Sequence, residues 1–316
     1  MDYPSPLDEI RAKVLTMAVD KEMQHEAIRT VGVVVKPNAP EAVEALRTLV
    51  SQHPEYRFVA ESIGYHALEE LPSEIDRVEP SEMQNVSDLV VVLGGDGTLI
   101  HASRLLQERV VPVLGINIGT IGFMTDVALD ELGKGFKAAV AGELPYHDRM
   151  RLRSHVQRGD NVIHEAVLLN EVVLSHFALA RLATYSIFSQ GNLVTRIRGD
   201  GVIAATPTGS TAYALAAGGS ILTPGIHAIA VTPISPQQLT QRQLIVDAGS
   251  VLSFRVESES KVLITFDGQK GYDFHPGDEL VVQDAKLPLR LLHVPWRSYF
   301  ETLRSKLGWG DAGSRT

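Results

Sequence analysis

Residues 89–104, LVVVLGGDGTLIHASR, decide the fold that this sequence predicts. Five apolar residues, 89–93, come directly before a glycine pair, which is typical of a strand buried on both faces. Leu99, Ala102 and Leu105 then recur with helical spacing, so a helix should cover that strand. The glycines allow the backbone to approach a ligand closely, and free N–H groups at the start of a helix favour an anion. The segment therefore predicts a strand, a phosphate-binding turn and a helix.

Asp96 lies between Gly95 and Gly97 at the carboxyl end of the predicted strand, where open α/β sheets bind their ligands. The turn matches neither the P-loop pattern nor G-x-G-x-x-G, so the carboxylate itself is the candidate reagent. A structural interpretation also exists, because many strand-to-helix turns are glycine-rich and Asp is a common helix cap. Both interpretations are open at this point.

The five residues 94–98, GGDGT, resemble the signature of a kinase superfamily. That superfamily contains NAD kinases, diacylglycerol kinases and sphingosine kinases and, more distantly, phosphofructokinases. The signature alone implies a kinase and leaves the substrate undefined.

The composition is that of a globular protein: 316 residues, 44% of them hydrophobic, are enough for one large or two ordinary domains. The formal net charge of −9 argues against a nucleic-acid or acidic-membrane partner, because both need clustered Lys and Arg. The absence of Cys excludes disulfides and a thiol nucleophile and agrees with a reducing compartment. An acidic N-terminus and the lack of an apolar run of about 20 residues predict a cytoplasmic protein.

The first half of the chain predicts an α/β domain with a Rossmann-like parallel sheet, over residues 1–145. Residues 31–36 and 56–61 are predicted strands, and a helix should run from Pro40 to Val50 between them. Residues 64–86 are polar and predict irregular structure, and residues 1–28 look like an extension.

A second polar turn follows the apolar strand predicted at 113–119. Asn117, Gly119 and Gly122 lie near the carboxyl end of that strand, so this turn and the GGDGT turn should converge on one crevice. Asn117 could instead cap a turn. Residues 117–125 resemble the N-x-G-x-x-G-F-[LM]-T element of NAD kinases, with Thr120 where Arg is common, so a charge at that position is in doubt.

The pattern changes after Pro145. From residue 150 to about 294, alternating and β-branched runs with closely spaced turns predict an all-β sandwich, here assigned to residues 146–294. One helix, from Ser210 to about Gly218, should interrupt it. Residues 295–316 form a third segment, a helix with aromatic and apolar residues on one face followed by a tail.

The sandwich contains an Asn170-Glu171 pair inside an apolar run. Adjacent residues on a regular strand point to opposite faces, so only one of the two could reach a site unless the strand ends or bulges there. A buried polar pair requires partners, which could be a ligand or a structural hydrogen-bond network. The pair matches the N-E motif with which NAD kinases hold adenosine.

Residues 198–219, RGDGVIAATPTGSTAYALAAGG, form the most specific pattern in the chain. The hydroxyl-rich turn 206–211 could be a capping device. The whole run, however, resembles the long G-D-G…T-P-T-G-S-T-A-Y element of NAD kinases nearly residue for residue, and diacylglycerol kinases lack it. The resemblance implies an NAD kinase fold in which the C-terminal helix returns to the first domain.

Carried over to matching positions, the resemblance implies a role for each residue. Asp96 would accept the proton of the ribose 2′-hydroxyl, with Gly97 beside it, and Asn170 and Glu171 would bind the adenosine half of NAD. The remaining implied dinucleotide contacts are Arg181, Arg198 (toward a neighbouring subunit's ligand), Asp200 (at the nicotinamide end), Thr211, Ala212, Tyr213, Ala214, Leu215, Ala216 and Gln269. Gln269 belongs to a D-x-Q element that could equally be a plain Asp-Gly hairpin turn.

The resemblance implies transfer of the γ-phosphoryl group of ATP, or of a phosphoryl group from polyphosphate, to the 2′-hydroxyl of NAD. A divalent cation, with Mg²⁺ expected, would be held mostly by the phosphates; the 11 His residues show no metal-site spacing, and no protein ligand is predicted. The family also implies a homo-dimer or homo-tetramer. A lipid kinase and a dinucleotide sensor without catalysis are the alternatives.

Overall fold

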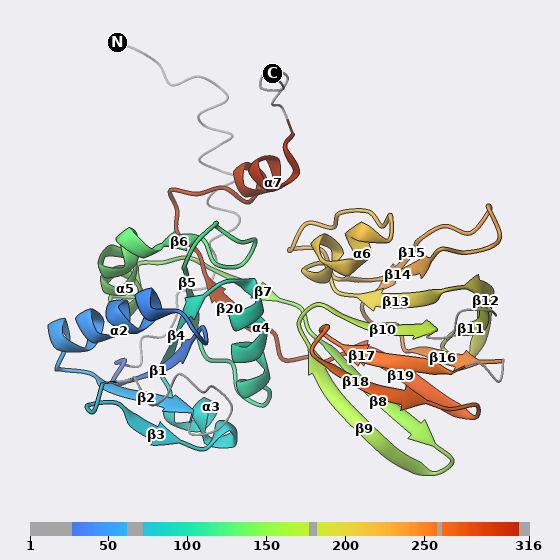
Figure 1. Cartoon of the computed structure of the whole chain (residues 1–316), viewed down its shortest axis with the longest axis horizontal. Coiled ribbons are helices and arrows are strands. Elements are labelled where there is room, and N and C mark those ends of the chain that lie inside the picture. The colour runs from blue at the N-terminus through green and yellow to red at the C-terminus, as the bar shows by residue number, and fades with distance from the viewer. Residues whose placement is uncertain (1–26, 62–71, 177–181, 258–260, 310–316) are drawn as a thin grey trace.

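A mostly parallel sheet forms the first lobe of the molecule (Figure 1). The computed structural model describes residues 27–61, 72–176, 182–257 and 261–309. In spatial order the strands are β3 (Asp76–Val78), β2 (Arg57–Glu61), β1 (Thr30–Val35), β4 (Leu89–Gly94), β5 (Val113–Asn117), β20 (Leu289–Leu292) and β7 (Tyr146–Arg149), with the short β6 (Val127–Ala128) also on β5. All pairs are parallel except β20 with β7. The predicted α/β domain is confirmed.

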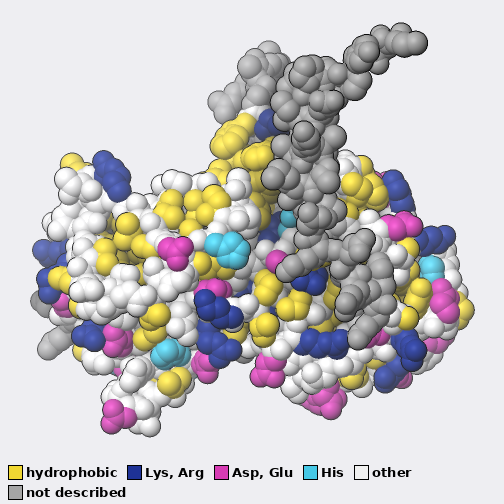
Figure 2. Space-filling view, turned by 180° about the vertical axis from the view of Figure 1, so that it is seen from behind, with side chains coloured by type: hydrophobic (Ala, Val, Ile, Leu, Met, Phe, Trp, Pro, Cys, Tyr) yellow, Lys and Arg dark blue, Asp and Glu magenta, His cyan; other side chains and the backbone are white. Residues whose placement is uncertain are grey.

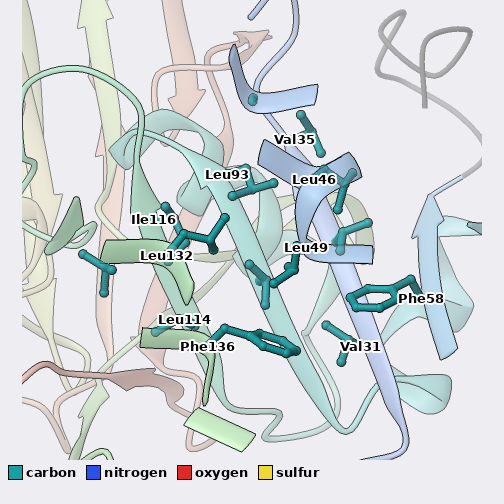
Figure 3. Close-up of a cluster of buried hydrophobic side chains, with 14 of the residues drawn as sticks. Val31, Val35, Leu46, Leu49, Phe58, Leu93, Leu114, Ile116, Leu132 and Phe136 are labelled. Atoms are coloured by element: carbon teal, nitrogen blue, oxygen red, sulfur yellow. The ribbon is translucent and has the colours of Figure 1, made fainter. Parts of the chain in front are cut away.

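Helices cover both faces of this sheet because its central strands β1, β4 and β5 are apolar at nearly every position. On one face, side chains such as Val31, Leu93 and Ile116 pack with Leu46 and Phe136 (Figure 3). The helices on that face are α2 (Pro40–Gln52) and α5 (Leu132–Val140), the latter preceded by the 3₁₀ helix η3 (Leu129–Glu131). The other face is covered by α3 (Met83–Val86) and α4 (Asp96–Leu105).

Irregular structure was predicted for residues 64–86, and for part of them this is wrong. β3, the 3₁₀ helix η2 (Pro80–Glu82) and α3 lie between residues 76 and 86, whereas 62–71 are outside the described residues. β3 is a three-residue edge strand in which Val78 alone is buried, and α3 is a single turn. Elements this short show no periodicity in sequence.

The second lobe is a sandwich of two antiparallel six-stranded sheets, as the sequence predicts. One sheet has the order β15 (Leu244–Asp247), β14 (Ala228–Ile234), β13 (Gly201–Ala205), β10 (Glu171–His176), β17 (Val262–Phe266) and β18 (Lys270–Phe274). The other has the order β12 (Asn192–Gly199), β11 (Ala183–Ser189), β16 (Leu252–Val256), β19 (Asp278–Asp284), β8 (Leu152–Arg158) and β9 (Asn161–Leu168). Alternate side chains of both sheets, among them Leu152, Val172 and Phe254, fill the space between them.

The helix predicted from Ser210 to Gly218 is two short pieces. The 3₁₀ helix η4 (Gly209–Thr211) and α6 (Tyr213–Ala216) are separated at Ala212, whose φ of −99° and ψ of −127° are not helical. Ala214 packs with Ile203 and Ala205 on the outer face of the first of the two sheets.

The first lobe is built from both ends of the chain. β7 and β20 belong to its sheet. The predicted sandwich, residues 146–294, therefore includes one strand of the first lobe at each of its ends. α7 (Tyr299–Leu307) begins three residues later than Trp296, because Ser298 and Glu301 form a capping box there. Of the predicted apolar face, Leu303 is buried and Phe300 is 55% exposed. Trp296 donates to Glu131 of the first lobe, so the C-terminal segment returns to that lobe as the resemblance implies.

The described surface carries mixed charges. On the face seen in Figure 2, Lys and Arg side chains are interspersed with Asp and Glu. Within the described residues, no helix is long and apolar enough to cross a membrane.

Candidate active site at the junction of the two lobes

The GGDGT turn lies where α4 starts, at the carboxyl end of β4 and beside β5 (Figure 1). Gly94 and Asn117 are register partners, which brings the ends of the two strands together. A Cβ atom on Gly94 would overlap the side chain of Thr98, so the turn requires glycine at this position. The two turns therefore meet, as predicted.

A cavity of about 490 Å³ opens at this meeting point. It is lined by Lys36, Gly95, Gly97, Thr98, Asn117, Ile118, Thr120 and Gln269. Four segments of the chain converge on it: the ends of β1, β4 and β5 in the first lobe and the β17–β18 turn in the second. A lysine and the N-terminus of a ten-residue helix on one wall make it suitable for an anionic ligand.

The carboxylate of Asp96 is seated on residues 123–125. Its oxygens accept hydrogen bonds from the backbone N–H of Phe123 (2.9 Å) and Met124 (3.1 Å) and from Oγ1 of Thr125 (3.3 Å). Thr125 is fully buried and its hydroxyl accepts a hydrogen bond from Nδ2 of Asn117. A Cβ atom on Gly122 would overlap Oδ1 of Asp96. These contacts fix the direction of the carboxylate, a more demanding arrangement than a helix cap.

The Asn170-Glu171 pair lies in a turn whose backbone N–H groups are hydrogen-bonded to the buried carboxylate of Asp267. Asp267 accepts hydrogen bonds from the backbone N–H of Leu169 (3.1 Å), Asn170 (2.8 Å) and Glu171 (3.0 Å). Asn170 lies in the bend before β10, so the pair is at a strand end and both side chains can serve one site.

The side chains of this pair have unused polar atoms. Asn170 is 7% exposed and Glu171 is 5% exposed, yet Oδ1 of Asn170 and Oε2 of Glu171 have no hydrogen-bond partner among the described residues. Buried polar atoms are costly without a partner, so this pattern favours a ligand over a closed structural network.

Burial and the nearby charge of Asp267 raise the pKa of Glu171 to about 8. Burial also raises the pKa of Asp267, but its three N–H donors and Arg104 oppose that rise. With a pKa of about 8, Glu171 holds a proton at neutral pH.

A pH dependence of stability follows. Between pH 4.5 and about 8 the folded protein keeps a proton on Glu171 that the unfolded chain has released, so the free energy of unfolding falls as pH rises through this window. Glu171→Gln should remove up to about 1.4 kcal/mol per pH unit from that slope. Urea unfolding of both proteins across the window measures it, and parallel curves would show that Glu171 ionises at its ordinary pKa.

The hydroxyl-rich segment 206–211 packs against the same turn. Oγ1 of Thr206 donates to the carbonyl of Leu169, and the backbone N–H of Thr206 donates to the carbonyl of Asn170. A Cβ atom on Gly209 would overlap that carbonyl. Oγ of Ser210 donates to the carbonyl of Pro207 in its own segment and accepts from the backbone N–H of Leu222, so here the structural interpretation holds for an individual hydroxyl.

The other predicted contacts differ in position. Among residues 211–216, Tyr213 and Ala216 are exposed and Thr211, Ala212 and Leu215 are half-buried. The side chain of Ala214 is buried in the core, so this residue could contact a ligand only through its backbone. Arg181 lies outside the described residues.

Asp200 and Arg198 do not join the cavity. Glu171 pairs with Ala205 at one end of β10 and β13, whereas Asp200 comes before Gly201 at the other end. Four to five residues of strand at about 3.4 Å each separate them, roughly 15 Å. Both residues are exposed.

Two arginines that the sequence interpretation missed hold α4 against the second lobe. Arg104 donates to Oε1 of Gln269 and to the carbonyl of Phe266. Arg151, 1% exposed, donates to the carbonyls of Ser103 and Leu106 at the C-terminal end of α4, and burial lowers its pKa to about 10. A cation at a helix C-terminus is stabilising. No motif marks either residue.

Fold and cavity together define a two-domain nucleotide-binding phosphotransferase. The chain matches the ATP-NAD kinase N-terminal domain over residues 8–144 and the ATP-NAD kinase C-terminal domain over residues 169–294. It belongs to the ATP-NAD kinase family, and its activity is that of an NAD kinase, which forms NADP from NAD.

Individual relatives agree with this assignment. The NAD kinase of Geobacter metallireducens is 40% identical over 235 residues, 74% of this chain and 83% of that protein. The NAD kinase of Citrifermentans bemidjiense is 36% identical over 292 residues, 90% of this chain and 100% of that protein.

Two solved structures share the fold. Yeast NADH kinase complexed with NADH aligns with a TM-score of 0.84 at 28% identity, covering 92% of this chain and 91% of that one. An NAD kinase from Archaeoglobus fulgidus in complex with ATP aligns with a TM-score of 0.66 at 25% identity, covering 87% and 99%. Neither the lipid kinase nor the non-catalytic sensor receives support from these comparisons.

Proposed function

We propose that Asp96 is the base that accepts the proton of the ribose 2′-hydroxyl of NAD during phosphoryl transfer. The observation that carries this proposal is the position of the carboxylate. Residues 123–125 hold it, and the neighbours of Asp96 in the chain, Gly95 and Gly97, line the cavity. Phosphoryl transfer has a loose transition state, so the protein contributes mainly positioning and charge neutralisation. Asp96 contributes to positioning by orienting the 2′-hydroxyl of NAD, and it then accepts the proton of that hydroxyl. Steady-state kinetics of the Asp96→Asn enzyme test this role.

The donor phosphates belong on the first-lobe side of the cavity. Lys36 and the N-terminus of α4 offer them positive charge, and Asn117 and Thr120 line the same wall. ATP is the expected donor, and polyphosphate presents the same phosphate chemistry. A coupled assay of NADP formation with each donor in turn distinguishes them.

Mg²⁺ is the expected metal. Among the described residues no group of three or more His, Asp or Glu side chains is arranged to hold an ion. Mg²⁺ keeps most of its water and phosphate ligands and needs few from protein, so the phosphates are expected to hold it. The ion would neutralise charge on the phosphates.

The dinucleotide belongs on the second-lobe side. Asn170 and Glu171 offer buried polar atoms to adenosine, Tyr213 of the 206–216 segment offers an exposed ring, and Gln269 lines the cavity. Arg198 and Asp200 lie roughly 15 Å along the sheet from Glu171, a distance that an extended dinucleotide can span, so Asp200 would face the nicotinamide end and Arg198 a neighbouring subunit's ligand.

A second copy of the chain is the expected partner. The edge strands β12 and β15, one from each sheet of the sandwich, expose apolar side chains. Gln241, in the segment between β14 and β15, donates to Thr195 and to the carbonyl of Arg196 in β12. The two edges therefore lie on one side of the sandwich. The exposed residues are Leu193, Val194, Leu239, Leu244 and Ile245. Exposed apolar side chains gathered at sheet edges on one side of a domain are typical of a protein–protein interface.

Leu239→Asp should shift the protein from dimer or tetramer to monomer in analytical ultracentrifugation. Leu239 is 88% exposed, so the substitution leaves the fold intact. Val162→Asp, at a 57% exposed position on β9, is the matched control and should keep the oligomer. Unchanged sedimentation of the Leu239 variant would exclude this surface as the interface.

Cytoplasmic location is a further proposal. It rests on the cysteine-free sequence and the acidic charge balance, which also speak against nucleic acid and membrane as partners. Fractionation of cells that express the protein tests it.

A further inference from the structure

Arg104 joins the catalytic helix to the turn that carries Gln269. Nη1 of Arg104 donates to Oε1 of Gln269 over 2.7 Å, and Nη2 donates to the carbonyl of Phe266 over 3.1 Å. Arg104 and Asp96 are on the same helix, about 12 Å apart at 1.5 Å per residue. One guanidinium therefore connects the rigid element that begins at Asp96 to both ends of the β17–β18 turn.

This contact fixes the orientation of the Gln269 side-chain amide. A guanidinium has N–H donors and no acceptor, so the amide atom that faces Arg104 has to be the oxygen. The amide nitrogen and its two N–H groups consequently point away from Arg104. Since Gln269 is the residue that the second lobe contributes to the cavity lining, these donors are available to a ligand there.

The same turn is connected to the adenosine site. Asp267, between Phe266 and Gln269, holds the backbone of Asn170 and Glu171. The second contact of Arg104, to the carbonyl of Phe266, braces the turn directly before Asp267. The backbone of Asn170 and Glu171 is thus held by Asp267 itself, whereas the Gln269 side chain takes its orientation from Arg104.

We propose that Arg104 is a positioning residue for NAD, which acts by holding the Gln269 amide with its N–H groups toward acceptor atoms of the dinucleotide. The inference rests on the proposed place of Gln269 in the NAD site. It assigns to Arg104 an effect on NAD that is transmitted through Gln269, with little effect on ATP.

The test is a double-mutant cycle with Arg104→Met and Gln269→Ala. Each single variant should raise the KM for NAD about tenfold, the loss of one oriented hydrogen bond, and leave the KM for ATP within about twofold. Because Arg104 acts through Gln269, the double variant should be no worse than Gln269→Ala alone. Arg104→Lys, which keeps one donor, should show an intermediate KM for NAD.

Arg109→Met is the matched control. Arg109 follows α4 and donates to the carbonyls of Gln84, Asn85 and Ser87, away from the turn, so its loss should change thermal stability and not the ratio of the two KM values. Single effects that multiply in the double variant would overturn the inference and leave the NAD site as proposed. An unchanged KM for NAD in Gln269→Ala would reject the place of Gln269 in that site, and the inference with it.

Discussion

Asp96→Asn should lower the kcat of NADP formation by about 1,000-fold while the KM for NAD changes little, because an amide cannot accept a proton at neutral pH and general-base catalysis contributes 10²–10⁴. The side chain keeps its size and its place at the start of α4. Its amide oxygen can retain one of the two backbone hydrogen bonds from Phe123 and Met124. The measurement is a coupled assay with NAD, ATP and Mg²⁺, with NAD binding determined separately by calorimetry.

Thr125→Val distinguishes proton transfer by Asp96 from the positioning of its carboxylate. It removes the hydroxyl that contacts both Asp96 and Asn117 and leaves the carboxylate itself in place. We expect kcat to fall by no more than about tenfold, because the contact that is lost, 3.3 Å between the Thr125 hydroxyl and the carboxylate, is a long hydrogen bond. If Asp96→Asn kept its full kcat, Asp96 would have no part in the proton transfer; if both variants lost activity equally, Asp96 would serve to position the loop.

The sequence predicted the fold and the site best where the pattern lies within one strand and the turn that directly follows it. The apolar run before Gly94 and the helical spacing after it are local, and parallel strands place their carboxyl ends at one edge, so the meeting of Asp96 with Asn117 could be predicted. The position of Asn170 before β10 needed the structure, because a sequence does not show where a strand ends to within two residues.

Contacts between distant segments were not predictable. β20 joins β5 and β7 in the first sheet although it follows the entire sandwich, and its short apolar sequence suits either lobe. Arg104 lies 165 residues from Gln269 in sequence, and on a helix beside polar residues it resembles an ordinary solvated arginine. Only the docking of the two lobes gives it a partner and a role.

Asp267→Asn should lower the free energy of unfolding by about 2–4 kcal/mol and raise the KM for NAD, because three buried N–H groups lose a carboxylate. Oδ1 of Asp267 accepts from Asn170 and Glu171, and Oδ2 accepts from Leu169. An amide has one oxygen, so at least one N–H would face an NH₂ group in the core. Backbone strain does not complicate the result, since Asn tolerates the φ of +49° at this position.

The exposed Asp273 on β18 provides the matched control, and Asp273→Asn should leave both stability and KM unchanged. The Asp267 variant has a second consequence. Because the charge of Asp267 contributes to the raised pKa of Glu171, its removal should lower that pKa and move the pH window of declining stability downward. A loss of stability without this movement would mean that the charge of Asp267 does not contribute to the raised pKa of Glu171.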